Sequence, residues 1–240
     1  RFAKHCSIGK VNMSPKRKLK VAAVIFDLDG TLIDSIDIYF RIVENALERL
    51  NLPPVSRSKI LAAAESENFK WELVLPREVQ SRQANIIDDA WAVTNEIAPR
   101  MFADDLDIIE GADGALKMVS AKGLKIGLVT STQKHYLETK MLPLKNAAID
   151  KLIEVIITSD DVKERKPAPD PLIMCAQQLE LKPADCVYVG DTTTDMKSGK
   201  AAGMYTVGVL TGFDDYDALQ TEQPDAIIDS IRNLSEVVAI

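Results

Sequence analysis

The sequence has few of the features that mark secreted or membrane-spanning proteins. Its three cysteines form no CxxC pair and aromatic residues make up only 5% of its 240 residues. No apolar run approaches the roughly 20 residues that a membrane-spanning helix needs. An odd number of unclustered cysteines favours a reduced, cytoplasmic compartment. Because aromatic residues are scarce, we expect a core built mainly from Val, Ile, Leu and Ala.

Histidine is also scarce, and basic charge is concentrated at one end. Neither of the two histidines, His5 and His135, is placed well for catalysis. Residues 1–20 hold seven basic residues and no acidic one, which leaves 22 basic against 36 acidic residues, about −14, in the rest of the chain. Such an acidic body argues against nucleic acid as a partner, and an anionic substrate would need a local site with a cation. We expect residues 1–20 to be a disordered basic tail, without the apolar segment of a secretory signal.

The stretch around which the chain is organised is VAAVIFDLDGTLIDS, residues 21–35. Its six apolar residues, Val21 to Phe26, run without alternation, as in a strand buried on both faces of a parallel sheet. Asp27 and Asp29 follow directly and point the same way, because side chains alternate along a strand. Paired carboxylates repel each other unless a cation joins them, and they can supply a nucleophile, an acid/base and metal ligands. A simple turn after the strand is the other interpretation.

The rest of the chain divides by its periodicity. Residues 36–103 carry helical stripes without a strand candidate, and Pro76 suits the first turn of a second long helix. After Gly111 helices and strands alternate, which predicts right-handed crossovers and a parallel sheet. Two further strands of this sheet end in polar residues, the first in Thr130 and Ser131, the second in Asp191 with Asp195. We therefore expect a helical block inserted into an α/β unit just after its first strand.

Four motifs in this order resemble those of the haloacid dehalogenase superfamily, whose members are mostly phosphatases. The motifs are DLDGTL (27–32), LVTST (128–132), RKPAPDP (165–171) and GDTTTD (190–195). Asp34-Ser35 and the closing segment 208–230 are similar to the phosphoglycolate phosphatase-like group. The resemblance implies a Rossmann-like parallel sheet core with helices on both faces (21–35 and 104–240) and an inserted all-helical cap (36–103). Glu110-Gly111 departs from the usual Pro-Gly, at a position that shapes a hinge beside the cap.

The resemblance also implies roles for individual residues. Asp27 would be the nucleophile that forms an aspartyl-phosphate, and Asp29 the acid/base. Mg²⁺ would be bound by Asp27, by the backbone carbonyl of Asp29, by Asp191 and, directly or through water, by Asp195; an oxygen-only site suits this ion. The phosphate would be held by Thr130, Ser131, Lys166 and backbone N–H groups near Gly30. On the helical block, Lys70, Arg77 and Arg82 are candidates for a second anionic group, although such charges are more often solvated.

The expected function is Mg²⁺-dependent hydrolysis of a small phosphomonoester, with 2-phosphoglycolate as the first candidate. Asp29 disfavours dehalogenases and phosphonate-cleaving relatives, which lack it, and the absence of histidine from residues 34–40 weakens a sugar-phosphate mutase. A mutase, a pyrophosphatase or a nucleotide phosphatase on the same site remain alternatives, as does a non-catalytic binding or regulatory protein. The expected partner is a small phosphorylated metabolite, with no nucleic acid and no membrane, and the chain would be a monomer or a homodimer.

Overall fold

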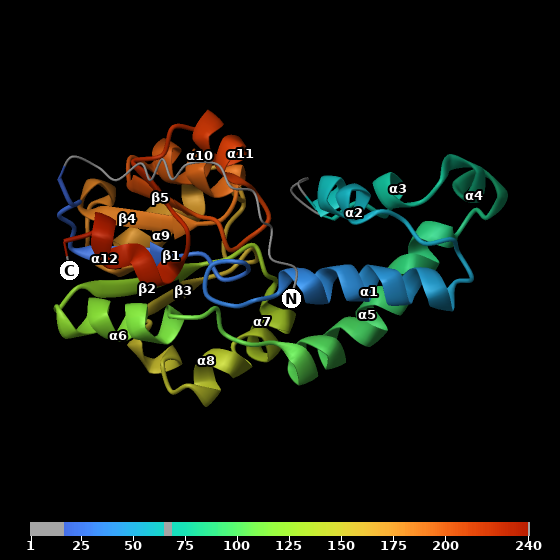
Figure 1. The fold of residues 1–240 in the computed structure, drawn as a ribbon, viewed down its shortest axis with the longest axis horizontal. Coiled ribbons are helices and arrows are strands. Elements are labelled where there is room, and N and C mark those ends of the chain that lie inside the picture. Colours follow the sequence, from blue (N-terminus) through green and yellow to red (C-terminus); the bar gives the residue numbers. More distant parts are fainter. Residues whose placement is uncertain (1–16, 65–68, 240) are drawn as a thin grey trace.

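A parallel sheet of six strands forms the centre of the computed structural model, which describes residues 17–64 and 69–239 (Figure 1). The strands are β1 (Ala23–Phe26), β2 (Lys125–Val129), β3 (Val155–Ile157), β4 (Cys186–Gly190), β5 (Tyr205–Val209) and β6 (Ala226–Ile228). Their order is β3-β2-β1-β4-β5-β6, and all pairs are parallel. The predicted α/β fold with a parallel sheet is confirmed. The expected basic tail lies mostly outside the described residues.

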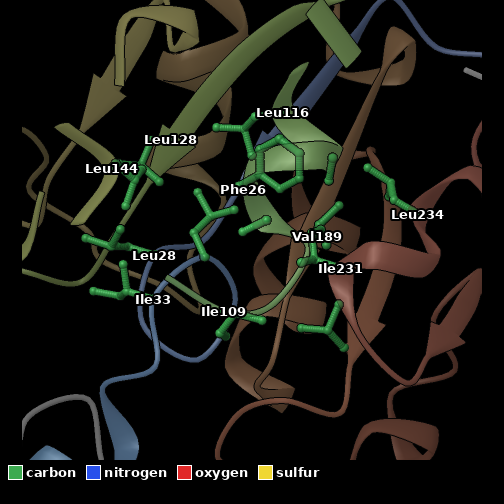
Figure 2. Packing of buried hydrophobic residues seen from close by; sticks show 14 of the residues in the cluster. Phe26, Leu28, Ile33, Ile109, Leu116, Leu128, Leu144, Val189, Ile231 and Leu234 are labelled. Carbon is green, nitrogen blue, oxygen red and sulfur yellow. The ribbon is translucent and has the colours of Figure 1, made fainter. Parts of the chain in front are cut away.

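Helices cover both faces of this sheet, as the unbroken apolar run of its first strand predicts. Val24 and Phe26 pack on the face that carries α6 (Ala112–Ala121), the 3₁₀ turn η3 (Ile231–Asn233) and α12 (Leu234–Val237). Figure 2 shows this cluster, with Phe26 beside Leu116. Ala23 and Ile25 face the other way, toward α9 (Asp170–Gln178). α10 (Thr193–Ala202) packs on β4 and β5. The sheet is therefore buried from both sides, which holds its strand ends in fixed positions.

A group of helices between β1 and α6 has an apolar core of its own. They are α1 (Ile36–Arg49), α2 (Arg57–Ala64), α3 (Trp71–Val74), α4 (Arg77–Arg82) and α5 (Ile86–Asp105). α1 and α5 lie side by side and carry the group beyond the sheet (Figure 1). Trp71, fully buried, belongs to the apolar cluster of the group. The proposed division into a core and a cap at residues 36 and 103 stays a prediction.

Several helix boundaries differ from those expected. The stripe after Pro76 predicts one long helix, but Gln83 has extended backbone and separates α4 from α5. An apolar stripe that keeps its period across a short break cannot reveal that break. The chain also forms α8 (Leu142–Asn146) directly after α7 (Lys134–Lys140), with Pro143 in its first turn, and α11 (Tyr216–Thr221). Among the described residues no helix combines the length and the hydropathy that crossing a bilayer requires.

Candidate active site

The candidate site lies at the carboxyl edge of the sheet, between the two strands where the chain changes direction. From β1 the chain proceeds to β2 and β3 on one side, and from β4 to β5 and β6 on the other. Ligands of open α/β sheets bind at such a switch point. Asp27 follows β1 and donates its backbone N–H to Val189 O in β4 at 2.8 Å. Asp191 follows β4, so the two carboxylates belong to adjacent strand ends, and both are buried.

One lysine joins the first and last of the acidic motifs. Lys166, in the loop between β3 and α9, places its Nζ atom 2.6 Å from Asp27 Oδ1 and 2.6 Å from Asp195 Oδ1. It also donates to the hydroxyl of Tyr188 at 3.0 Å. The side chain of Lys166 is only 5% exposed. The sequence alone is also compatible with a solvated Lys166, but in the structure this lysine is buried and bridges two carboxylates.

Asp195 accepts hydrogen bonds from several donors, and Asp191 accepts them from Phe213 and, at 3.4 Å, from the hydroxyl of Thr31. At the start of α10, Asp195 Oδ2 accepts the backbone N–H and the hydroxyl of Thr192 at 3.1 and 2.6 Å, and Thr192 in turn caps the helix. Asp191 Oδ2 accepts the backbone N–H of Phe213 at 2.8 Å. A Cβ atom at Gly212 would stand 1.8 Å from Asp191 Oδ2, so only glycine lets the chain pass so close to this carboxylate. Both side chains are thus fixed before any ligand arrives.

Burial and mutual repulsion shift the pKa values of the three carboxylates in this cluster in different directions. Burial raises the pKa of Asp27 to about 7, against the opposing effect of Lys166. Burial, followed by the charges of Asp195 and Asp27, raises the pKa of Asp191 well above its usual range. Burial also opposes the ionisation of Asp195, but the ion pair with Lys166 outweighs it and lowers the pKa of Asp195. One ammonium group therefore stabilises only part of the negative charge that three carboxylates can carry.

The remaining charge fits a divalent cation. Asp27, Asp191 and Asp195 each offer a carboxylate oxygen, and these three oxygens lie within 4.8 Å of one another. Hard cations such as Mg²⁺ prefer carboxylate and carbonyl oxygens and retain several waters. The donor set contains oxygen alone, and a cation would offset the burial and the repulsion by Asp195 and Asp27 that raise the pKa of Asp191. The residues present are therefore suited to hold Mg²⁺.

Asp29 turns toward a cation that the sequence analysis did not identify. Lys140, the last residue of α7, donates to Asp29 Oδ1 and Oδ2 at 2.9 and 2.7 Å. Thr132 donates its hydroxyl to Asp29 Oδ2 at 3.0 Å, and Lys140 reaches the hydroxyl of Tyr39 in α1. Burial opposes the ionisation of Asp29, yet the charge and hydrogen bonds of Lys140 lower its pKa. Asp29 is therefore held as a carboxylate beside, but not within, the cluster of Asp27.

The predicted phosphate-binding residues are arranged less uniformly. Thr130 and Ser131 follow β2 and line the same cavity as Asp27. The Thr130 hydroxyl accepts the backbone N–H of Thr132 at 3.0 Å. The backbone N–H of Gly30 donates to Ile33 O at 2.9 Å, inside its own turn. Of the two residues that follow β2, Ser131 is exposed and Thr130 is buried. Phosphate binding by these residues stays a prediction.

A model of the family described as haloacid dehalogenase-like hydrolase matches residues 24–209. The chain belongs to this family. Phosphoglycolate phosphatase of Escherichia coli is 30% identical over 233 residues, which cover 89% of this chain and 91% of the relative. These similarities support a phosphoric monoester hydrolase.

Solved structures have the same fold as this haloacid dehalogenase-like hydrolase. A predicted phosphoglycolate phosphatase from Haemophilus somnus matches with a TM-score of 0.78 at 20% identity, over 91% of this chain and 98% of that one. A haloacid dehalogenase family hydrolase from Deinococcus radiodurans, with bound phosphate and sodium, matches with a TM-score of 0.74 at 25% identity, over 90% and 93%. The likeness extends over the helices α1–α5 as well as the sheet, because nearly the whole chain is covered.

The site of this hydrolase opens into a cavity of about 550 Å³ between the sheet edge and the helices α1 and α5. Five carboxylates and three cations line the sheet side. The apolar lining, called the apolar wall below, comes from Ile42, Val43, Phe69, Trp91, Ala98 and Phe102 of the helical group, joined by Phe213 from the loop after β5. Lys70 and Arg77 are exposed and are not among the lining residues, and the side chain of Arg82 lies outside the described part. No charged side chain of the described part of α1–α5 faces the cavity.

Two functional candidates of the hydrolase carried no recognisable signal in the sequence. Lys140 stands in a helix among other charged residues, and nothing in that pattern separates a buried lysine from a solvated one. Tyr188 lies within an apolar strand, where a tyrosine is expected to be an ordinary core residue. Its hydroxyl is 3.0 Å from Asp195 Oδ1 and 3.2 Å from Val129 O, so it positions the Lys166 bridge. Only the strand order and the helix orientations reveal either role.

Proposed function

We propose that the chain hydrolyses a phosphomonoester in two displacements at Asp27, with a divalent cation, Mg²⁺ first among the candidates, as cofactor. The observation that carries this proposal is the buried cluster of Asp27, Asp191 and Asp195 with Lys166 at hydrogen-bonding distance from two of them. A buried carboxylate beside a fixed ammonium group suits covalent catalysis, because the ammonium group favours the ionised nucleophile and stabilises charge in the transition state.

In the first displacement an Asp27 oxygen attacks phosphorus, and the bond from phosphorus to the ester oxygen breaks. The leaving oxygen takes a proton from Asp29, and an aspartyl-phosphate remains. In the second displacement Asp29 removes a proton from water, which attacks the same phosphorus, so that phosphate leaves and Asp27 is restored. The ionised state in which Lys140 holds Asp29 suits the second step, and the first requires that Asp29 carry a proton.

The other candidates hold the phosphoryl group and the cation. Lys166, Thr130 and Ser131 would bind phosphoryl oxygens, and Asp195 would act mainly by fixing Lys166, since both of its oxygens already accept hydrogen bonds. A cation held by Asp27, the Asp29 backbone carbonyl and Asp191, with Asp195 nearby, would neutralise phosphoryl charge. The helices of residues 36–103 would act as a cap that excludes water in the first displacement and admits it for the second.

The test is phosphate release from a panel of substrates, with Mg²⁺, with EDTA and in Asp27→Asn. The panel contains 2-phosphoglycolate, the substrate named for the relatives, together with pyrophosphate, a nucleoside monophosphate and a sugar phosphate. Replacing a covalent nucleophile typically costs on the order of 10⁴-fold or more in turnover. Metal-dependent release that Asp27→Asn abolishes would support the proposal. Transfer of phosphate within a sugar bisphosphate, without release, would instead indicate a mutase, and no reaction of the folded protein would contradict the phosphatase.

A further inference from the structure

The apolar wall determines what kind of leaving group can occupy the cavity. In a substrate bound with its phosphorus at Asp27, the leaving group extends away from the sheet edge, toward α1 and α5. Ile42, Val43, Ala98 and Phe102 are almost fully buried, so the wall is a packed surface. The ring of Phe102 meets that of Tyr39 edge to face, with centroids 5.4 Å apart. A fixed aromatic surface of this kind favours another ring or an apolar group.

A charged leaving group would find no partner on this side. Arginines of the helical group pair with nearby acids of the same group, at 2.6 to 3.3 Å: Arg41 with Asp105, Arg49 with Glu96, Arg57 with Asp37 and Arg100 with Asp104. None of these arginines lines the cavity. A carboxylate buried against apolar side chains without a cation is strongly disfavoured. The wall therefore discriminates against leaving groups that carry a second negative charge.

The cations on the sheet side are already engaged. Lys140 donates to Asp29, and Lys166 bridges Asp27 and Asp195. Arg165 lines the cavity beside Lys166 and lies 3.9 Å from Asp160 Oδ1. Arg165 is engaged as well, but its side chain is the most exposed of the three, so exchange of its partners for a second anionic group of the substrate is the alternative that an experiment must exclude.

The cavity is also larger than a two-carbon leaving group requires. Its volume of about 550 Å³ falls within the range of pockets that bind drug-sized ligands. Polar groups are few on the helical side. Thr94 donates its hydroxyl to Ala90 O at 2.8 Å, and Asn95 Oδ1 accepts the hydroxyl of Tyr136 at 2.9 Å. A hydroxyl oxygen and an amide nitrogen therefore remain to bond an uncharged polar substrate.

We infer that the preferred substrate is a phosphomonoester whose leaving group is uncharged and contains a ring that packs on the apolar wall. This inference rests on the proposed phosphatase function and narrows its substrate class. It predicts that 2-phosphoglycolate, which carries a carboxylate and no ring, is a poor substrate of this chain.

The first experiment compares benzyl phosphate, ethyl phosphate and 2-phosphoglycolate. All three have a primary alkyl leaving oxygen, so their kcat/KM values differ mainly through the ring and the second charge. Since a single methylene in an apolar pocket changes kcat/KM by about 10- to 200-fold, we expect benzyl phosphate to exceed 2-phosphoglycolate by at least about tenfold. Turnover of 2-phosphoglycolate equal to or better than that of benzyl phosphate would overturn the inference and leave the phosphatase proposal intact. If Arg165→Gln then lost turnover of 2-phosphoglycolate but not of benzyl phosphate, Arg165 would be the cation that binds its carboxylate.

A binding measurement separates this inference from the proposed function. Calorimetry with Asp27→Asn and Mg²⁺ measures the affinities of benzyl phosphate and 2-phosphoglycolate without turnover. Tighter binding of benzyl phosphate supports the inference even if the wild-type protein releases phosphate from neither compound, an outcome that would contradict only the phosphatase. Tighter binding of 2-phosphoglycolate overturns it.

Two pairs of variants locate the effect on the wall. Trp91→Ala is expected to lower the ratio of benzyl to ethyl phosphate turnover about tenfold, whereas Leu73→Ala, an exposed apolar residue outside the cavity, leaves the ratio unchanged. Thr94→Arg should raise turnover of 2-phosphoglycolate relative to benzyl phosphate. Its control is Ala92→Arg, which adds the same charge to an exposed position of α5 outside the cavity. If the turnover ratio changed equally in a cavity variant and in its control, the apolar wall would not be what selects the leaving group.

Discussion

The two sides of the cavity differ in how their chemistry arises from the chain. The sheet side gathers charged residues from separate strand ends and loops, and most of them are buried. The helical side offers packed apolar side chains from α1 and α5, with Phe213. Strand ends meet at one edge whatever residues they carry, whereas a helix presents a residue to the cavity only through its rotation and packing. Reaction chemistry can therefore be read from motifs, and substrate choice requires the assembled structure.

The comparison also separates two kinds of energetic role. Buried charges on the sheet side oppose folding unless they are paired, and they are arranged to meet a developing charge. Apolar residues of the wall stabilise the helical group and at the same time shape the leaving-group space. Substitutions on the sheet side should thus change chemistry and stability together, and those of buried wall residues should change selectivity and stability together.

The largest effect is expected from Lys166→Met, which removes the shared cation of the sheet side. Asp27 and Asp195 would then be buried without a positive partner, and breaking such a buried pair costs about 3–5 kcal/mol in the free energy of unfolding. Phosphate release should also fall below detection. Chemical denaturation measures the stability. Lys197→Met is the matched control, because Lys197 forms an exposed pair with Glu222 at 3.5 Å and contributes at most about 1 kcal/mol. Equal losses in the two variants would show that the buried bridge has no special role.

The next effect concerns the cation that the sheet side is suited to hold. Binding of Mg²⁺ to the folded state should raise the free energy of unfolding by about 2.7 kcal/mol when its concentration is 100 times the dissociation constant. Asp191→Asn removes one anionic ligand and should abolish most of this increase. Asp214→Asn, which changes an acid that also lines the cavity but lies outside the cluster of three, is the control. Melting curves with and without Mg²⁺ measure this increase in stability without any substrate. If Mg²⁺ stabilised Asp191→Asn as much as the wild-type protein, the assignment of Asp191 to the cation site would be wrong.

Much of the sheet side could be predicted from the sequence, since three of its four motifs lie at the end of a buried apolar strand. Asp27, Thr130 and Asp191 lie at strand ends as expected, and the structure brings them to one cavity. The order of the strands was not predictable, because strand sequences buried on both faces carry no signal for their neighbours. That order is what makes Asp27 and Asp191 adjacent.

The helical side was largely beyond sequence analysis. Its apolar stripes predict helices, but the pattern does not distinguish an apolar residue that faces the core of the helical group from one that faces a cavity. Trp91 illustrates this, since it packs on the apolar cluster of the helical group and also lines the cavity. Lys70 and Arg77 were candidates by charge alone, and neither reaches the cavity. Lys140 was missed because its burial depends on the rotation of α7 against the sheet edge.

A smaller effect than that of Lys166 is expected at Lys140, whose partner Asp29 retains some exposure. Lys140→Met leaves Asp29 without its cation, and the loss of a hydrogen bond to a charged group costs about 2 kcal/mol. Because Asp29 is then less well oriented, kcat should fall more than KM changes, and Lys140→Arg should restore part of kcat. Lys145→Met, at an exposed lysine that pairs with Glu138, is the control. A change in stability without a change in kcat would assign Lys140 a structural role only.

The smallest effect is expected at Tyr39, the residue that joins the two sides. Its ring packs on Phe102 of the apolar wall, and its hydroxyl accepts a hydrogen bond from Lys140. Tyr39→Phe keeps the ring and removes the hydroxyl, so stability should fall by about 1 kcal/mol, the net value of one hydrogen bond. Tyr205→Phe, at an exposed position of β5, should change stability by less than about 0.5 kcal/mol. If the hydroxyl orients Lys140 and thereby Asp29, Tyr39→Phe lowers kcat equally for benzyl and ethyl phosphate, because the wall itself is intact. A change in their ratio would show instead that Tyr39 acts through the wall, and the two sides would no longer be separable at this residue.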